Sequence, residues 1–228
     1  MAFEILKYSF KSNLLLGSIE PDYMLKLEGI KSVELFTKND VLYEQGSEPK
    51  AVYHLRKGKV KIEQLGQDGK TRIVYVYIHG DFFGFRPLLS NEKHPVTAIF
   101  LEDSEIEIYE GNEFIKIAKE SSNLSFNLVE ILSFEFNVWI NLISSLSHKS
   151  AKEKIALILL ILNEKYRNED GISEIIMTKS DISKYSETSK ETVVRVIGYL
   201  EKQGVLINKG RTFEIINHKI LEIIAEGF

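Results

Sequence analysis

The segment from Thr178 to Ile197 constrains the fold of this chain more than any other. Its sequence, TKSDISKYSETSKETVVRVI, predicts a short helix, a polar turn at 186–188 and a second helix. Thr178 followed by Asp181 three residues later indicates a capped start for the first helix. Ser189 caps the second, whose inner face is apolar at Val193, Val196, Ile197 and Leu200. This arrangement predicts a helix-turn-helix.

The start of the second helix directs polar and charged side chains outward. The outward residues are Lys190, Glu191, Thr192, Val194 and Arg195. In the major groove of DNA, guanine offers acceptors to Lys or Arg, and cytosine offers a donor to a carboxylate. We therefore predict that Lys190, Glu191 and Arg195 read bases in duplex DNA.

Two short β runs, 205–208 and 212–216, follow the second helix and predict a hairpin. Its tip, Lys209-Gly210-Arg211, is cationic and could lie on the phosphate backbone. Hydroxyl groups at helix N-termini also suit phosphate oxygens. The residues predicted to hold phosphates are Thr178, Ser189, Thr192, Lys209 and Arg211.

The chain before this motif divides into a β-rich segment and a helical segment. From about 34 to 109, short β-rich runs alternate with glycine turns, which predicts a sandwich or barrel preceded by a helical piece at 21–30. The clearest runs are 41–43, 51–55, 60–64 and 73–78. A helix at 112–119 then leads into a long apolar stripe at helical spacing.

That stripe predicts a helix that pairs with its twin in a homodimer. The seam residues would be Leu128, Ile131, Leu132, Trp139, Leu142 and Leu146. Ordinary core packing against the β domain is the alternative. Residues 147–150 are polar and predict a hinge, after which Ser150 and Glu153 form a capping box for a helix at 151–166 that ends in a loop at 167–171.

Several classes of protein are excluded or disfavoured. The chain has no cysteine, which excludes disulfides, thiolate metal sites and cysteine-ligated iron–sulfur clusters. The five histidines form no metal-binding motif, and no nucleotide-binding loop or nucleophile elbow occurs. We expect no metal, no cofactor and no enzyme activity. The start does not read as a signal peptide and 155–162 is too short to span a bilayer, so we expect a cytoplasmic protein with no membrane contact.

These features together resemble the Crp/Fnr family of bacterial transcription regulators. Ser189 to Arg195, SKETVVR, is similar to the family's S-R-E-T-V-x-R recognition helix. Supporting matches are EQG at 44–46, YHLRKGKV at 53–60 and GDFFG at 80–84. The resemblance implies an α+β fold. It would comprise a β-roll of the cyclic-nucleotide-binding kind at 1–110 (a jelly-roll-like double-stranded β-helix), a dimerisation helix and hinge at 111–149, and a winged helix-turn-helix at 150–228.

The chain departs from the family pattern at two kinds of position. Lys190 replaces the usual Arg, and Glu187 replaces the Gly common in the turn. In the effector pocket, Phe85 stands where cyclic-AMP binders have Glu, and His94-Pro95 stands where they have Arg-Ser. The implied pocket residues are Phe83, Gly84, Phe85, Arg86, His94, Pro95 and Trp139. A buried phosphate needs a cation or several donors, which Phe85 and Pro95 do not supply, so we expect no binding of cyclic AMP in the usual way. Arg86 is a spare cation that could still allow an anion to bind.

The predicted function is a homodimeric transcription regulator on a palindromic operator, with RNA polymerase as a further partner and a sensor domain for an unknown small molecule. The alternative is a small-molecule sensor or adaptor whose helical C-terminal domain docks a protein instead of DNA. Salt-dependent binding to DNA distinguishes the two.

Overall fold

The computed structural model describes residues 3–167 and 173–227. Residues 168–171 of the predicted loop therefore lie outside the described residues. Contacts divide the chain into two units, which we call the N-terminal unit (10–136) and the C-terminal unit (3–9 with 137–227). The division falls inside the long helix, whereas the predicted functional boundaries lie at 110 and 149.

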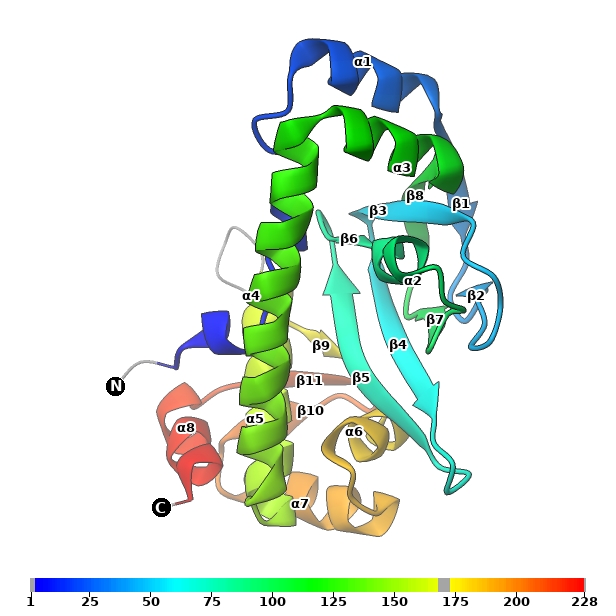
Figure 1. Ribbon diagram of the computed structural model, residues 1–228. Helices are drawn as coiled ribbons and strands as arrows, with labels where there is room; N and C mark the ends of the chain where they lie inside the picture. Colours follow the sequence, from blue (N-terminus) through cyan, green and yellow to red (C-terminus); the bar gives the residue numbers. More distant parts are fainter. Residues whose placement is uncertain (1–2, 168–172, 228) are drawn as a thin grey trace. The chain divides into compact units, whose positions relative to one another are not determined.

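Two four-stranded antiparallel sheets form the frame of the N-terminal unit (Figure 1). The first has the order β1-β8-β3-β6 and the second the order β2-β7-β4-β5. The strands are β1 (Lys31–Phe36), β2 (Val41–Tyr43), β3 (Ala51–Lys57), β4 (Lys59–Leu65), β5 (Thr71–Ile78), β6 (Phe82–Phe83), β7 (Thr97–Phe100) and β8 (Ser104–Glu110). The two sheets confirm the β-roll that the family resemblance implied, and the spaced short runs had predicted a sandwich or barrel in this region.

Aromatic rings fill much of the interior between these strands. Phe83 stacks on Tyr77 with ring centroids 4.6 Å apart, and Tyr53 lies 5.5 Å from Phe83. Phe10 stacks on Tyr75 at 3.7 Å. Large buried rings of this kind contribute most of a core's apolar area, so they fix how closely the two sheets approach.

Helices cover one end of the N-terminal unit, where α1 (Pro21–Gly29) and α3 (Gly111–Glu120) lie side by side (Figure 1). A short helix, α2 (Phe85–Ser90), follows β6, and 3₁₀ turns occupy Ile5–Lys7 and Ser12–Leu14. The long helix α4 (Ser122–Ser147) begins directly after α3. Leu124, Leu128 and Ile131 of α4 enter the core of the unit beside Leu27 and Phe114.

The C-terminal unit is built around α5 (Ala151–Tyr166), whose residues from 155 to 162 are all buried. The predicted capping box between Ser150 and Glu153 is present. Three further helices, α6 (Lys179–Ser186), α7 (Lys190–Lys202) and α8 (His218–Glu226), pack against α5. The remaining elements are the strands β9 (Ile175–Ile176), β10 (Leu206–Asn208) and β11 (Thr212–Ile215), in the order β10-β11-β9.

Candidate nucleic-acid interface

The first helix of the candidate interface, α6, begins with the predicted capping box. The Thr178 hydroxyl donates to Asp181 Oδ2 at 2.6 Å and accepts from the Asp181 backbone N–H at 3.0 Å. Ile182 and Tyr185 are buried, so α6 packs its apolar face inward. The Thr178 hydroxyl is therefore already engaged in the cap, and so is its backbone N–H, which donates to Asp181 Oδ2 at 3.3 Å. The predicted phosphate contact of Thr178 would compete with this cap.

The turn between α6 and α7 reverses the chain at Glu187. This residue has φ 51° and ψ 42°, in the left-handed region that favours glycine. The backbone N–H of Thr188 closes the turn by donating to the Ser183 carbonyl at 3.1 Å. The family's glycine is thus replaced without loss of the turn, at the cost of a strained Glu.

The second helix, α7, buries one face and exposes the other. Val193, Val196, Ile197 and Leu200 are buried as predicted. Lys190, Glu191 and Arg195 are exposed on the opposite side, together with Val194, which is 50% exposed. The structure therefore brings the three predicted base-reading residues onto one outward face.

Electrostatics differ among these three side chains. Lys190 and Arg195 make no ion pair with any residue that the structure describes. Glu191 has a lowered pKa because its carboxylate accepts hydrogen bonds from its own backbone N–H and from Ser189. The two cations are free to bind an anionic partner, whereas Glu191 is held near the helix N-terminus, where a negative charge is favourable.

Hydroxyl groups at the start of α7 contact each other. Ser189 Oγ accepts from the Thr192 backbone N–H at 3.2 Å and lies 3.1 Å from Thr192 Oγ1. This cap orients the first turn of α7. The predicted phosphate contacts of Ser189 and Thr192 would share these hydroxyls with the cap.

The predicted wing is the β10–β11 hairpin. Its turn is closed by the Lys209 N–H donating to the Thr212 carbonyl at 2.9 Å, with Gly210 at φ 89°. Lys209 pairs with Glu214 at 2.9 Å, which raises the pKa of Lys209. Arg211 is exposed and makes no ion pair in the described parts of the chain. Of the two predicted wing cations, Arg211 has no ionic partner in the described chain, whereas Lys209 would share its charge between Glu214 and a phosphate.

Comparison with known proteins agrees with this geometry. Residues 33–121 match the cyclic nucleotide-binding domain family, and residues 153–224 match the Crp-like helix-turn-helix domain family. The chain belongs to the Crp/Fnr family of transcription regulators. Its C-terminal unit thus carries a helix-turn-helix domain of the DNA-binding kind, which favours DNA over the protein-docking alternative.

Named relatives place the chain among Crp/Fnr regulators. It is 28% identical over 192 residues to the fumarate and nitrate reduction regulatory proteins of Yersinia pestis and Escherichia coli K12, covering 82% of this chain and 76% of each relative. The structure of FixK2 from Bradyrhizobium japonicum matches with a TM-score of 0.75 and 23% identity, over 86% of this chain and 97% of FixK2. A putative Crp/Fnr regulator from Eubacterium rectale matches with a TM-score of 0.76 and 16% identity, over 93% of this chain and 98% of its own. These two structures confirm the fold.

The predicted effector pocket of this Crp/Fnr chain is largely closed by its own side chains. Phe83 and Phe85 are each 1% exposed and His94 is 2% exposed. A Cβ on Gly84, which has φ 87°, would lie 2.6 Å from the Tyr53 ring, so only glycine fits there. Pro95 is exposed instead of facing the interior, and Trp139 belongs to the C-terminal unit.

Arg86, the one spare cation of that pocket, is already paired. Its Nε donates to Glu135 Oε2 of α4 at 2.6 Å, and Nη1 donates to the Tyr77 hydroxyl at 3.2 Å. Both partners were missed from the sequence, because no local pattern relates Arg86 to Glu135, 49 positions away, or to Tyr77, nine positions away. An incoming phosphate would meet a buried carboxylate as well as the guanidinium.

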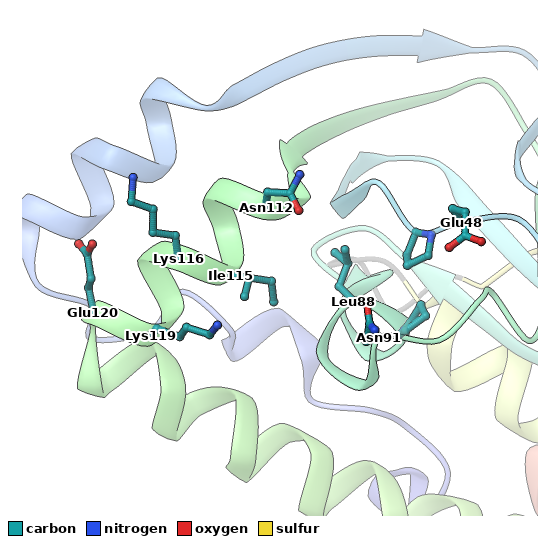
Figure 2. A pocket seen from close by; sticks show the side chains of 10 residues that line it. Glu48, Leu88, Asn91, Asn112, Ile115, Lys116, Lys119 and Glu120 are labelled. Atoms are coloured by element: carbon teal, nitrogen blue, oxygen red, sulfur yellow. The ribbon is translucent and has the colours of Figure 1, made fainter.

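An open groove lies elsewhere on the N-terminal unit, with a volume of about 560 Å³ (Figure 2). Apolar Leu88 and Ile115 lie between the charged side chains of Lys119 and Glu48 (Figure 2). None of the predicted effector residues lines this groove. It is a surface feature between α2, α3 and the chain near Glu48.

The predicted seam on α4 requires a correction. Leu128, Ile131 and Leu142 are 4%, 3% and 4% exposed within the chain itself, so they cannot form a surface seam. Leu132, Trp139 and Leu146 are partly buried. The prediction selected the face of α4 that packs inward, because a single sequence does not reveal which of two apolar faces meets the core. The exposed apolar residues of α4 are Phe126, Val129, Phe136, Ile140 and Ile143.

Proposed function

We propose that this regulator is a homodimer that binds a two-fold symmetric DNA site by placing one copy of α7 in each of two successive major grooves. The observation that carries the proposal is the exposed face of α7, where Lys190 and Arg195 have no ionic partner in the described chain while the opposite face is buried. Paired helices of this kind contact half-sites about one DNA turn apart.

Each side chain of the interface has a distinct role in this proposal. Arg195 binds guanine O6 and N7 through two donors, and Lys190 binds as a single-point donor. Glu191 accepts from the cytosine amino group. Val194, for which the sequence suggested no role, offers methyl groups for contact with thymine. Phosphate contacts come from Arg211, Lys209 and the hydroxyl-capped starts of α6 and α7.

The dimer is held by the exposed apolar stripe of α4. The spacing between Phe126, Val129, Ser133, Phe136, Ile140 and Ile143 alternates between three and four residues. This is the heptad spacing that keeps a seam facing a partner helix. Phe126 and Phe136 are 68% and 66% exposed, which is costly for large rings in water.

A membrane reading of α4 has less support. The helix is long and apolar enough to cross a bilayer by length and composition, although one such helix is weak evidence. Its apolar exposed residues follow a single 3–4 stripe, and Glu130, which is not part of that stripe, is also exposed on α4. A spanning helix would present apolar side chains to lipid on every face not covered by protein. A helix partner needs only a stripe, so the proposal keeps the protein in the cytoplasm.

The β-roll, in this proposal, does not bind cyclic AMP in the usual way. Phe85 and Pro95 supply no donor for a phosphate, and Arg86 is neutralised by Glu135. An effector, if the domain takes one, is of another chemical class. RNA polymerase is proposed as a protein partner because transcription regulators act on it.

Binding to DNA tests the proposal directly. We expect Arg195→Ala to weaken binding to an enriched site by about 10- to 100-fold, which corresponds to about 1–3 kcal/mol for a bidentate base contact. Fluorescence anisotropy over a range of salt concentrations measures the change. Lys219→Ala is the matched control. Lys219 is an exposed cation on α8, so its substitution removes the same charge outside the helix-turn-helix. Equal losses for the two variants would contradict base reading by Arg195.

A further inference from the structure

A buried ion pair joins α2 to α4 in the N-terminal unit. Arg86 directs Nε and Nη2 to the same oxygen, Oε2 of Glu135, and its third nitrogen, Nη1, to the Tyr77 hydroxyl. The guanidinium carbon lies 5.0 Å from the centre of the Phe10 ring and 5.7 Å from that of Phe85. The cation is thus held by aromatic rings, by the Tyr77 hydroxyl and by a single carboxylate oxygen, and Nη2, although close to that oxygen, makes no hydrogen bond with any residue that the structure describes.

Glu135 uses only one of its two carboxylate oxygens to bind Arg86. Its side chain is 2% exposed, yet Oε1 is buried and has no hydrogen-bond partner among the residues that the structure describes. A buried acceptor without a hydrogen bond destabilises the folded state, because it has lost its hydration and gained no partner. Burial raises the pKa of Glu135, and the charge of Arg86 offsets only part of this effect. A carboxylate that used both oxygens on the Arg86 fork would be held better.

We propose that Arg86 and Tyr77 form a binding site for a small oxyanion, and that Glu135 of α4 is its resident anion. The chain then carries its own ligand at the base of α2. An external carboxylate or phosphate binds there only after Glu135 is displaced or removed. This site is independent of how α7 reads DNA.

The geometry explains why an anion from solution would enter once Glu135 is absent. Truncation of Glu135 leaves a buried guanidinium without its counter-ion, which is strongly unfavourable. About a third of the Arg86 side chain is exposed, which gives a small anion a route from solvent. Formate has the planar shape and charge of the missing carboxylate and matches the space left by an alanine.

Anion-dependent stability of Glu135→Ala tests the proposal. We expect 100 mM formate to raise the melting temperature of this variant by about 3 °C or more over equimolar chloride, since a bound ligand stabilises the folded state. The wild-type protein should show no such difference, because its site is occupied. Glu130→Ala is the matched control, since it removes an exposed carboxylate from the same helix.

The remaining outcomes also decide the question. If Glu135→Ala does not fold in chloride, refolding in formate supports the site, and failure to refold in formate overturns it. A folded Glu135→Ala that responds to formate no more than Glu130→Ala overturns it as well. The double variant Arg86→Met with Glu135→Ala should fold without any formate response, because the cation that holds the anion is gone. A retained response there would place the anion elsewhere.

Discussion

The buried side chain of His94 in the β-roll interior favours its uncharged form. The ring of His94 stacks on Tyr43 with centroids 3.8 Å apart, and its Nε2 is buried without a partner in the described chain. Burial lowers the pKa of His94 because the charged form loses its hydration. The residue at the position where cyclic-AMP binders of the family have Arg is therefore a neutral aromatic packing element here.

This burial predicts a specific dependence of stability on pH. The unfolded chain takes up a proton at His94 as pH falls through about 6.5, whereas the folded chain takes it up only at lower pH. Stability present above pH 6.5 is then lost as the solution becomes more acidic. We expect His94→Phe, which keeps the stack on Tyr43, to become progressively more stable than wild type between pH 7.5 and 5. A difference in melting temperature between the two proteins that stays constant from pH 7.5 to 5 would contradict the account.

Single elements show which features a sequence can predict. The capping boxes at Thr178 and Ser150 were predictable because their partners lie three residues apart, and the structure contains both. Strand 41–43 and helix 151–166 were predicted at the bounds that the structure gives. Local patterns of this kind determine where helices and strands begin, and the β-roll and helix-turn-helix follow from them.

Long-range features could not be predicted in the same way. The pairing of Arg86 with Glu135 depends on how α4 packs, and no local signal reports it. The two apolar faces of α4 are equally visible in the sequence, and only the packed core distinguishes Leu128 from Val129. α2 and β9 are short and were not predicted. α8 was also missed, although Asn217 at its start and Gly227 at its end are signals that could have located it.

The left-handed backbone conformation of Glu187, in the turn between α6 and α7, should lower the stability of the folded chain. Glu187 adopts a left-handed conformation in which a Cβ is unfavourable by about 1 kcal/mol or more, partly offset by the greater freedom of an unfolded glycine. We expect Glu187→Gly to be about 0.5–1 kcal/mol more stable than Glu187→Ala, measured by chemical denaturation of the full chain. Glu187→Ala is the right reference because it removes the carboxylate but keeps the Cβ. Equal stability of the two variants would show that the turn is not strained.

At the scale of the whole molecule, the account requires two chains. One copy of α7 gives too few base contacts for a specific site, whereas two copies double the contacts and fix their spacing. The α4 stripe supplies the surface for this pairing. Its largest exposed rings, Phe126 and Phe136, therefore contribute most to dimer stability in this account.

A charge in that stripe should separate the subunits. We expect Phe136→Glu to raise the dimer dissociation constant at least about 100-fold, because both copies lose a buried ring and two like charges meet at the seam. Analytical ultracentrifugation measures the change. Leu25→Glu is the matched control, since Leu25 is 71% exposed on α1 and lies outside the stripe. A Phe136→Glu protein that stays dimeric would show that α4 does not form the seam.

Selection of bound duplexes from a random-sequence DNA pool tests the central claim most directly. The account predicts that the wild-type protein enriches an inverted repeat whose half-sites lie about 10 base pairs apart from centre to centre. Arg195→Ala should lose preference at one guanine in each half-site and retain the spacing. Enrichment of single, unpaired half-sites, or an identical enriched sequence from the wild type and Arg195→Ala, would contradict it.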